Sequence, residues 1–173
     1  MKRIQKPLEG EYVPYTIMYI GLLPDDGLVL RHLRNNFTAT RDLILSLPEK
    51  KLLHRYAPGK WTIKEILAHI VDDERIYAYR ALRFARNDAT ELPGFDQEEF
   101  AKYSNANARS VKEMLNEFAT VRKATLSLFN GLDHEALTRS GTANGGIMSV
   151  RAAAYHIAGH ELRHVNVIKE RYL

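Results

Sequence analysis

Residues 62–87 read TIKEILAHIVDDERIYAYRALRFARN, and this stretch predicts a long amphipathic helix. Thr62 is followed three residues later by Glu65, which is the capping-box pattern of a helix N-terminus. The Pro58-Gly59 turn comes just before it. The apolar residues recur at steps of three and four and so predict one buried face, made of Ile63, Ile66, Leu67, Ile70, Tyr77, Ala81 and Phe84.

The same period predicts three further helices, at residues 26–47, 110–130 and 149–171. Ser110 and Glu113 form a second capping box, and Asp25 or Asp26 is expected to cap the first helix. Gly131 suits the end of the third helix. No stretch alternates in the manner of a β-strand. The sequence therefore predicts an all-α fold in the form of a four-helix bundle.

The link between the second and third helices predicts how they are oriented. It spans residues 88–108, about 21 residues, whereas helix–helix links usually take about 2–8. A link of this length can run along the whole bundle, which allows the second and third helices to be parallel. We therefore expect an up-down-down-up topology.

Composition narrows the classes of protein that the chain can represent. It has 173 residues, 25 Lys and Arg against 21 Asp and Glu, and no cysteine. The length suits one domain. The lack of cysteine excludes a disulfide scaffold, a cysteine zinc site and a cysteine nucleophile. Because the basic residues are scattered, the net charge of +4 gives little support to nucleic-acid binding.

Residues 1–24 differ from the rest of the chain. Pro7, Pro14 and Pro24 interrupt regular structure, and tyrosine and aliphatic residues lie between them. We expect this Pro/Tyr-rich N-terminal extension to pack on the bundle of residues 25–173 or to lie in a subunit contact. The segment lacks the apolar core of a signal peptide, and no stretch is long enough to cross a membrane. A cytoplasmic protein is therefore expected.

Histidines interrupt the apolar stripe of the last helix. His160 and His164 stand where the stripe calls for Val, Ala or Ile, and polar groups there need partners. Two histidines four residues apart can reach one metal ion. His156 and His164 are about 12 Å apart along the axis, so 156/160 and 160/164 are alternative pairs. Two hydrogen-bonded core histidines are the competing interpretation.

His69 discriminates between these two pairs. In an up-down-down-up bundle the second and fourth helices are antiparallel, so His69 lies level with His160 and His164 and His156 lies one turn away. Three histidines without a fourth protein ligand form an open site for a divalent metal ion, zinc or nickel, with iron or copper as alternatives. Asp73, one turn after His69, is a candidate to orient a ligand or a metal-bound water, or else a solvated helix acid.

Two other patterns have competing interpretations. Glu161 and His164 have the Glu-x-x-His spacing of di-iron bundles, but helix 62–87 has no Glu three residues before a His, which argues against a dimetal site. Arg80, Arg83 and Arg86 step along helix 62–87 by threes. They could receive a carboxylate-bearing thiol, but a solvated helix face is the interpretation we favour.

Three motifs make the chain resemble the DinB/YfiT-like superfamily over roughly residues 25–173. They are PGKWTIKEILAHI at 58–70, YRALRFAR at 79–86 and AGHELRH at 158–164. The resemblance implies an up-down-down-up four-helix bundle with His69, His160 and His164 around a divalent metal. Some members are transferases or isomerases that use bacillithiol or mycothiol, and members are often homodimers, so the resemblance also implies a homodimer.

We therefore expect a metal-dependent enzyme that acts on a small molecule, either a transferase or a hydrolase. One such activity is that of an S-transferase, which joins a low-molecular-weight thiol to an electrophile. Any such thiol has to arrive with the substrate, because the chain has no cysteine. The alternative is a non-catalytic metal-binding stress or interaction protein. Neither a membrane nor a nucleic acid is an expected partner. The substrate, the metal, and the roles of residues 1–24 and of His156 remain open at this point.

Overall fold

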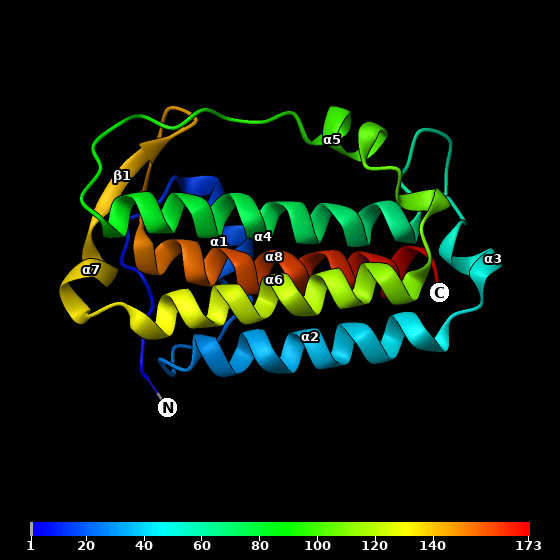
Figure 1. Cartoon of the computed structure of the whole chain (residues 1–173), viewed down its shortest axis with the longest axis horizontal. Coiled ribbons are helices and arrows are strands. Elements are labelled where there is room, and N and C mark those ends of the chain that lie inside the picture. Colours follow the sequence, from blue (N-terminus) through cyan, green and yellow to red (C-terminus); the bar gives the residue numbers. More distant parts are fainter. Residues whose placement is uncertain (1) are drawn as a thin grey trace.

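The computed structural model describes residues 2–173, and four long helices dominate it. They lie side by side in Figure 1: α2 (Val29–Ser46), α4 (Ile63–Ala85), α6 (Val111–Gly131) and α8 (Val150–Arg171). Each falls within three residues of its predicted bounds. The prediction of a helical bundle is therefore confirmed.

The capping residues read from the sequence explain where three of these helices begin. The Thr62 side chain accepts a hydrogen bond from the Glu65 amide, while the Glu65 carboxylate accepts one from the Thr62 amide. Ser110 begins α6 with the same box, and Ser149 caps α8. The α2 helix differs, because Leu28 is its N-cap and no side chain caps it. Asp26 instead accepts the Leu28 amide in the preceding turn.

The direction of each helix follows from contacts across the bundle. The Lys64 ammonium donates to the Arg109 carbonyl at 2.8 Å, which places the starts of α4 and α6 together. Thr40 on α2 donates to Glu161 on α8 at 2.7 Å. In Figure 1, α2 and α8 run from left to right along the sequence, whereas α4 and α6 run from right to left. Hence α4 is antiparallel to α8, and its N-terminal part faces the C-terminal half of α8.

The structure corrects the expectation that the chain contains no strands. Strands β1 (Ser140–Ala143) and β2 (Gly146–Ser149) pair antiparallel. Asn144 and Gly145 connect them with φ values of 53° and 70°, which is the Asn-Gly turn that matches the twist of a hairpin. No strand was predicted here, although the Asn-Gly pair is itself a hairpin signal. The fold is therefore mostly helical with one small β-hairpin.

Short helical elements also occupy segments that were expected to be irregular. The link between α4 and α6 contains α5 (Gln97–Tyr103) and the 3-10 turn η2 (Ala106–Ala108). The others are η1 (Pro14–Thr16), α1 (Ile17–Ile20), α3 (Glu49–Leu52) and α7 (His134–Thr138). The link pairs with the hairpin, since the Leu92 amide donates to Thr142 and Leu92 accepts from the Asn144 amide, both at 2.9 Å.

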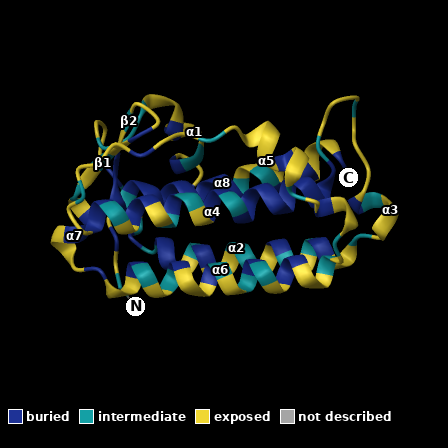
Figure 2. Cartoon of the chain, turned by 45° about the horizontal axis from the view of Figure 1, so that its top comes forward, coloured by how far each residue is buried: buried dark blue, intermediate teal, exposed yellow. Residues whose placement is uncertain are grey.

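Burial is uneven among the four helices. Figure 2 shows α4 and α8 largely buried, whereas α2 and α6 expose their outer faces. The reason is that the N-terminal segment, the hairpin and α5 cover the side of α4 and α8 that faces away from α2 and α6. A polar cluster lies inside the bundle, where Arg122 binds the carboxylates of Glu74 and Glu161. No described helix is long and apolar enough to cross a membrane.

The N-terminal segment packs against α8 and the hairpin. The Glu11 carbonyl accepts the Ser149 amide at 2.8 Å, and the Glu11 carboxylate pairs with Arg151. Further along, α1 lies against α8 so closely that a Cβ atom at Gly159 would come within 2.2 Å of the Tyr19 carbonyl oxygen. The absence of a side chain at Gly159 is therefore what allows Tyr19 to approach α8.

Candidate metal centre

Three histidines meet between α4 and α8. The Nε2 atom of His160 lies 3.0 Å from Nε2 of His69 and 3.1 Å from Nε2 of His164. One ring nitrogen from each of the three lies within 4.8 Å of the others. The structure thus brings together the three histidines that the sequence analysis grouped, and it leaves His156 outside the group.

The two helices present these side chains as two facing stripes. On α4 the spacing of His69, Asp73, Tyr77 and Arg80 is four, four and three residues, which keeps them on one face. On α8 the histidines recur every fourth residue. Because the helices are antiparallel, His69 faces the C-terminal end of the α8 stripe, while Asp73 faces its earlier turns.

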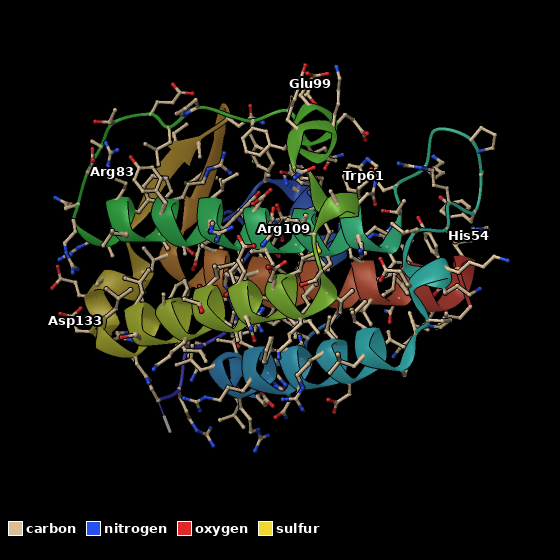
Figure 3. The ribbon with its side chains drawn as sticks, turned by 45° about the vertical axis from the view of Figure 1, so that its right-hand side comes forward. His54, Trp61, Arg83, Glu99, Arg109 and Asp133 are labelled. Atoms are coloured by element: carbon tan, nitrogen blue, oxygen red, sulfur yellow. The ribbon has the colours of Figure 1, made fainter. Side chains whose placement is uncertain are left out.

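Trp61 packs against the His69 ring at the start of α4, with 4.8 Å between ring centroids. The indole nitrogen of Trp61 donates to the Glu98 carboxylate on α5 at 2.9 Å. Figure 3 shows Trp61 beside α5, and His54 well away from it at the end of the bundle. The link between α4 and α6 therefore holds the indole that fixes one side of the His69 ring.

Asp73 connects the cluster with His156. Its Oδ2 atom lies 3.3 Å from Nδ1 of His160 and 3.2 Å from Nε2 of His156. The Asp73 side chain is buried, so the alternative of a solvated helix acid is wrong. His156 stacks on Tyr77 with 3.6 Å between centroids, and Tyr19 contacts both His156 and His160 edge-on. Within the described residues, Oδ2 of Asp73 and Nδ1 of His156 are both buried without a hydrogen bond, so Oδ2 of Asp73 lies near the two rings without meeting hydrogen-bond geometry.

Burial determines the charge state of the cluster. Removal from water lowers the pKa of His164 to about 4 and lowers the pKa of His69 and of His160 as well. Burial also tends to raise the pKa of Asp73, but His160 and His156 outweigh burial and bring that pKa below its ordinary value. At neutral pH the site therefore holds three neutral imidazoles beside one carboxylate. Neutral imidazole is the form of histidine that binds metals.

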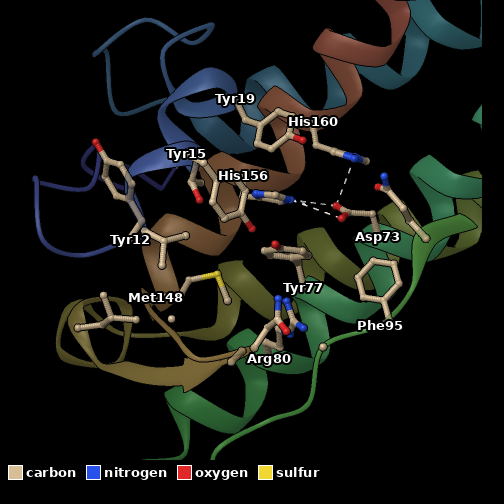
Figure 4. A pocket seen from close by; sticks show the side chains of 18 residues that line it. Tyr12, Tyr15, Tyr19, Asp73, Tyr77, Arg80, Phe95, Met148, His156 and His160 are labelled. Atoms are coloured by element: carbon tan, nitrogen blue, oxygen red, sulfur yellow. Dashed lines mark hydrogen bonds and ion pairs between the residues drawn. The ribbon is translucent and has the colours of Figure 1, made fainter.

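A cavity of about 350 Å³ opens next to the cluster (Figure 4). Residues of α4 and α8, among them Asp73, His156 and His160, form part of its wall, and the N-terminal segment, the hairpin and the chain around the start of α5 supply the rest. Four tyrosines line it: Tyr12, Tyr15, Tyr19 and Tyr77. Burial raises the pKa of Tyr19 and of Tyr77, so both phenols keep their protons. A second cavity of about 210 Å³ reaches His164 from the other side.

Sequence reasoning missed several residues of this cavity. Tyr77 was assigned to the apolar core, and Arg80 was placed on a solvated helix face. The Arg80 side chain is in fact buried and lines the cavity, which makes that interpretation wrong for this residue. Arg83 is partly exposed and pairs with Asp88. The four-four-three spacing of His69, Asp73, Tyr77 and Arg80 was the signal in the sequence that could have placed Tyr77 and Arg80 on the same face as His69.

The structure agrees with the argument against a dimetal site. The Glu161 carboxylate accepts hydrogen bonds from Thr40 at 2.7 Å and from Arg122 at 2.9 Å. Thr40 belongs to α2 and Arg122 belongs to α6. Glu161 is not among the residues that line the cavity. Its oxygens are therefore engaged elsewhere and do not join the histidines.

Fold and cluster together define a class of small helical bundles in which two antiparallel helices bring three histidines together beside a cavity. The chain belongs to the DinB superfamily, whose family model matches residues 32–168. The resemblance found in the sequence motifs is thereby confirmed. All three clustered histidines and Asp73 lie inside the matched stretch, whereas the tyrosines of the N-terminal segment lie outside it.

Two relatives carry names that refer to metals. The chain is 28% identical, over 130 residues that make up 74% of each sequence, to a protein of Oceanobacillus iheyensis named "putative metal-dependent hydrolase". The fold of this chain is similar to that of YfiT from Bacillus subtilis, with a TM-score of 0.71 and 15% identity. The match covers 95% of this chain and 90% of YfiT. YfiT is described as "a probable metal-dependent hydrolase with an unusual four-helix bundle topology".

Proposed function

We propose that His69, His160 and His164 bind one divalent metal ion and that the chain is a metal-dependent enzyme. The approach of His160 Nε2 to the Nε2 atoms of His69 and of His164 carries this proposal. Nitrogen ligands at about 2.0–2.1 Å from a tetrahedral ion lie about 3.3 Å from one another. The two separations from His160, 3.0 and 3.1 Å, are near this value, and one ring nitrogen from each of the three histidines lies within 4.8 Å of the others, which supports a single ion.

The contact between Asp73 and His160 supports the same role. A carboxylate that accepts the Nδ1 proton leaves Nε2 with a free lone pair, and it orients the ring of a metal-binding histidine. The competing interpretation, in which the three rings only form hydrogen bonds with one another, fits this geometry less well than a shared metal ion does. The Nε2 atom of His160 has one lone pair, yet it faces two other ring nitrogens.

A metal bound by three imidazoles would supply Lewis acidity and activate a bound water or thiol. All-nitrogen ligation fits zinc or nickel, and also iron or copper. The residues of the chain hold the other groups. Tyr19 and Tyr77 keep protonated phenols at the cavity wall, and the Asp73 carboxylate lies 3.3 Å from Nδ1 of His160, where it can orient the ring. The N-terminal segment and the chain around the start of α5 supply much of the wall beside the site.

We propose a group transfer to water or to a thiol as the reaction class. The names of both relatives favour hydrolysis. An S-transfer to an electrophile uses the same site, and its thiol would come from a low-molecular-weight cosubstrate. The cavity of about 350 Å³ beside His160 favours catalysis over a purely structural metal site, because a structural site is usually closed by protein ligands. We propose a homodimer as the assembly.

Metal content tests this proposal directly. Purified protein is expected to hold about one zinc or nickel ion per chain by elemental analysis, and His160→Gln is expected to lose it. His134→Gln is the matched control, because His134 is exposed at the start of α7. Wild-type protein that binds no divalent metal after incubation with each ion would refute the proposed centre.

Activity separates the reaction classes. Metal-loaded protein is compared with the His160→Gln variant on ester and amide substrates, and on electrophiles with bacillithiol, mycothiol or glutathione. Metal-dependent turnover in one set assigns the class. The absence of turnover in both sets would contradict the proposal that the chain is an enzyme. If removal of the metal also leaves the melting temperature unchanged, a structural role for the metal is contradicted as well.

A further inference from the structure

Arg80 is a buried cation that no acidic side chain neutralises. Its side chain is 5% exposed. One terminal nitrogen donates to the Pro93 carbonyl at 2.9 Å, and the guanidinium carbon lies 5.0 Å from the centre of the Tyr77 ring. Within residues 2–173, no carboxylate lies within ion-pair distance of this guanidinium. Buried charges are normally paired, so this one calls for an explanation.

The guanidinium faces the cavity that reaches the histidine cluster. Arg80 and Asp73 both line it, and they lie on one face of α4 (Figure 4). Seven residues of helix separate them, which is about 10 Å along the axis. Tyr77 lies between, with its ring stacked on His156 on one side and the guanidinium on the other. The cavity thus has a cationic end at Arg80 and a histidine end at His160.

We propose that the substrate is a small carboxylic acid whose carboxylate pairs with Arg80 while its reactive end lies at His160. This inference rests on the proposed metal centre and adds to it the chemical class of the substrate. The guanidinium has five N–H donors, of which one is used by Pro93, so a free edge can bind a carboxylate with two parallel hydrogen bonds.

The lining of the cavity favours a carboxylate over a phosphate. Arg80 is the only lysine or arginine among the lining residues, and one cation matches one negative charge better than it matches the higher charge of a phosphate. Tyr77 lies between the two ends, and the other tyrosines and Phe95 add aromatic surface to the wall. A planar or aromatic body joined to the carboxylate would fill this space.

Binding of benzoate tests the proposal, with benzamide as the neutral probe of the same shape. Titration calorimetry on metal-loaded protein is expected to show that benzoate binds and that benzamide binds at least about tenfold more weakly. Arg80→Met is expected to weaken benzoate binding about ten- to hundredfold, because it removes a charged hydrogen-bond donor. Arg80→Lys should fall between, since lysine keeps the charge but lacks the planar fork.

Arg86→Met is the matched control, because Arg86 is exposed just after the same helix. This substitution is expected to leave benzoate binding unchanged. Equal benzoate binding by wild type and Arg80→Met would overturn the proposal, as would equal binding of benzamide, or no binding of benzoate to wild type. If Arg80→Met loses its melting transition, Arg80→Lys and Arg80→Gln replace it.

Each titration is repeated after chelation, with the metal content measured. The Arg80-dependent difference in benzoate affinity is expected to persist in metal-free protein. If benzoate binding requires the metal and is unchanged by Arg80→Met, the carboxylate binds the metal and not Arg80. This result would overturn the present inference but not the proposed metal centre. Protein that takes up no metal would instead refute the proposed centre, while the Arg80 comparison still gives its answer.

Discussion

The Nδ1 atom of His160 lies 3.3 Å from Oδ2 of Asp73, and this contact joins α8 to α4 beneath the histidine cluster. It divides the two nitrogens of one imidazole between two tasks. Nδ1 faces the carboxylate, and Nε2 faces the other histidines. Asp73 also contacts His156, so one buried carboxylate lies next to two imidazole rings.

Asp73→Asn is expected to weaken metal binding about 10- to 100-fold, because the amide cannot provide the negative charge that raises the basicity of His160. Competition with a chromophoric chelator measures the affinity. Asp72→Asn is the control, since Asp72 is only partly buried and pairs with Arg75. Equal metal affinity in Asp73→Asn and wild type would show that Asp73 does not support the ligand.

Acid is expected to destabilise the metal-free protein. The folded pKa of His164 is about 4, and those of His69 and His160 are also lowered, whereas an unfolded histidine titrates near about 6.5. Between these values the unfolded chain binds more protons, so the free energy of unfolding falls as the pH falls from about 6.5 towards 4. Above about pH 7 this contribution is fully present.

Urea unfolding in the presence of a chelator, at several pH values between about 5 and 7.5, measures this slope. The double variant His69→Gln/His164→Gln is expected to show a shallower slope, because two of the titrating groups are gone. An identical slope in the variant would mean that other groups cause the acid sensitivity.

Gly159→Ala is expected to lower the free energy of unfolding by about 1–3 kcal/mol, because the new Cβ would lie 2.2 Å from the Tyr19 carbonyl oxygen and force α1 away from α8. Gly131→Ala is the matched control. No atom lies within 4 Å of a Cβ built there, and alanine favours a helix, so stability should stay equal or rise by up to about 1 kcal/mol. Similar urea midpoints for both variants would contradict the close approach of α1.

Arg122→Met is expected to lower the free energy of unfolding by about 3–5 kcal/mol. The substitution leaves the carboxylates of Glu74 and Glu161 buried without their cation, and both side chains are at most 1% exposed. Arg75→Met removes an exposed ion pair to Glu117 on the same pair of helices and should cost about 1 kcal/mol or less. Denaturant unfolding of both variants tests the difference. A loss below about 1 kcal/mol for Arg122→Met would contradict it.

The helices and the histidine group were predictable because their signals are local. A capping box occupies four consecutive residues, and Thr62 and Ser110 make theirs as the pattern predicts. The spacing of His160 and His164 places two rings on one face of any helix. The position of His69 along the bundle needed one further inference. The length of the 88–108 link indicates that α4 runs antiparallel to α8, so the N-terminal part of α4 meets the C-terminal half of α8.

The cavity was not predictable because its walls come from distant segments. An apolar stripe predicts that one face of α4 is buried, but α4 is covered on a second face by α5, the hairpin and the N-terminal segment. Arg80 lies on that second face, where the sequence pattern is that of a solvated helix. Its burial follows only from packing around residues 93–97 and 143–148, which depends on tertiary contacts.

The tyrosines near the N-terminus have a consequence for how this protein can diversify. The imidazoles lie within residues 32–168, which the family model matches, but Tyr12, Tyr15 and Tyr19 lie before that stretch. The histidine cluster and this part of the cavity wall are therefore encoded in separate parts of the sequence. An exchange of the first 24 residues is expected to alter this part of the wall while His69, His160 and His164 keep their places.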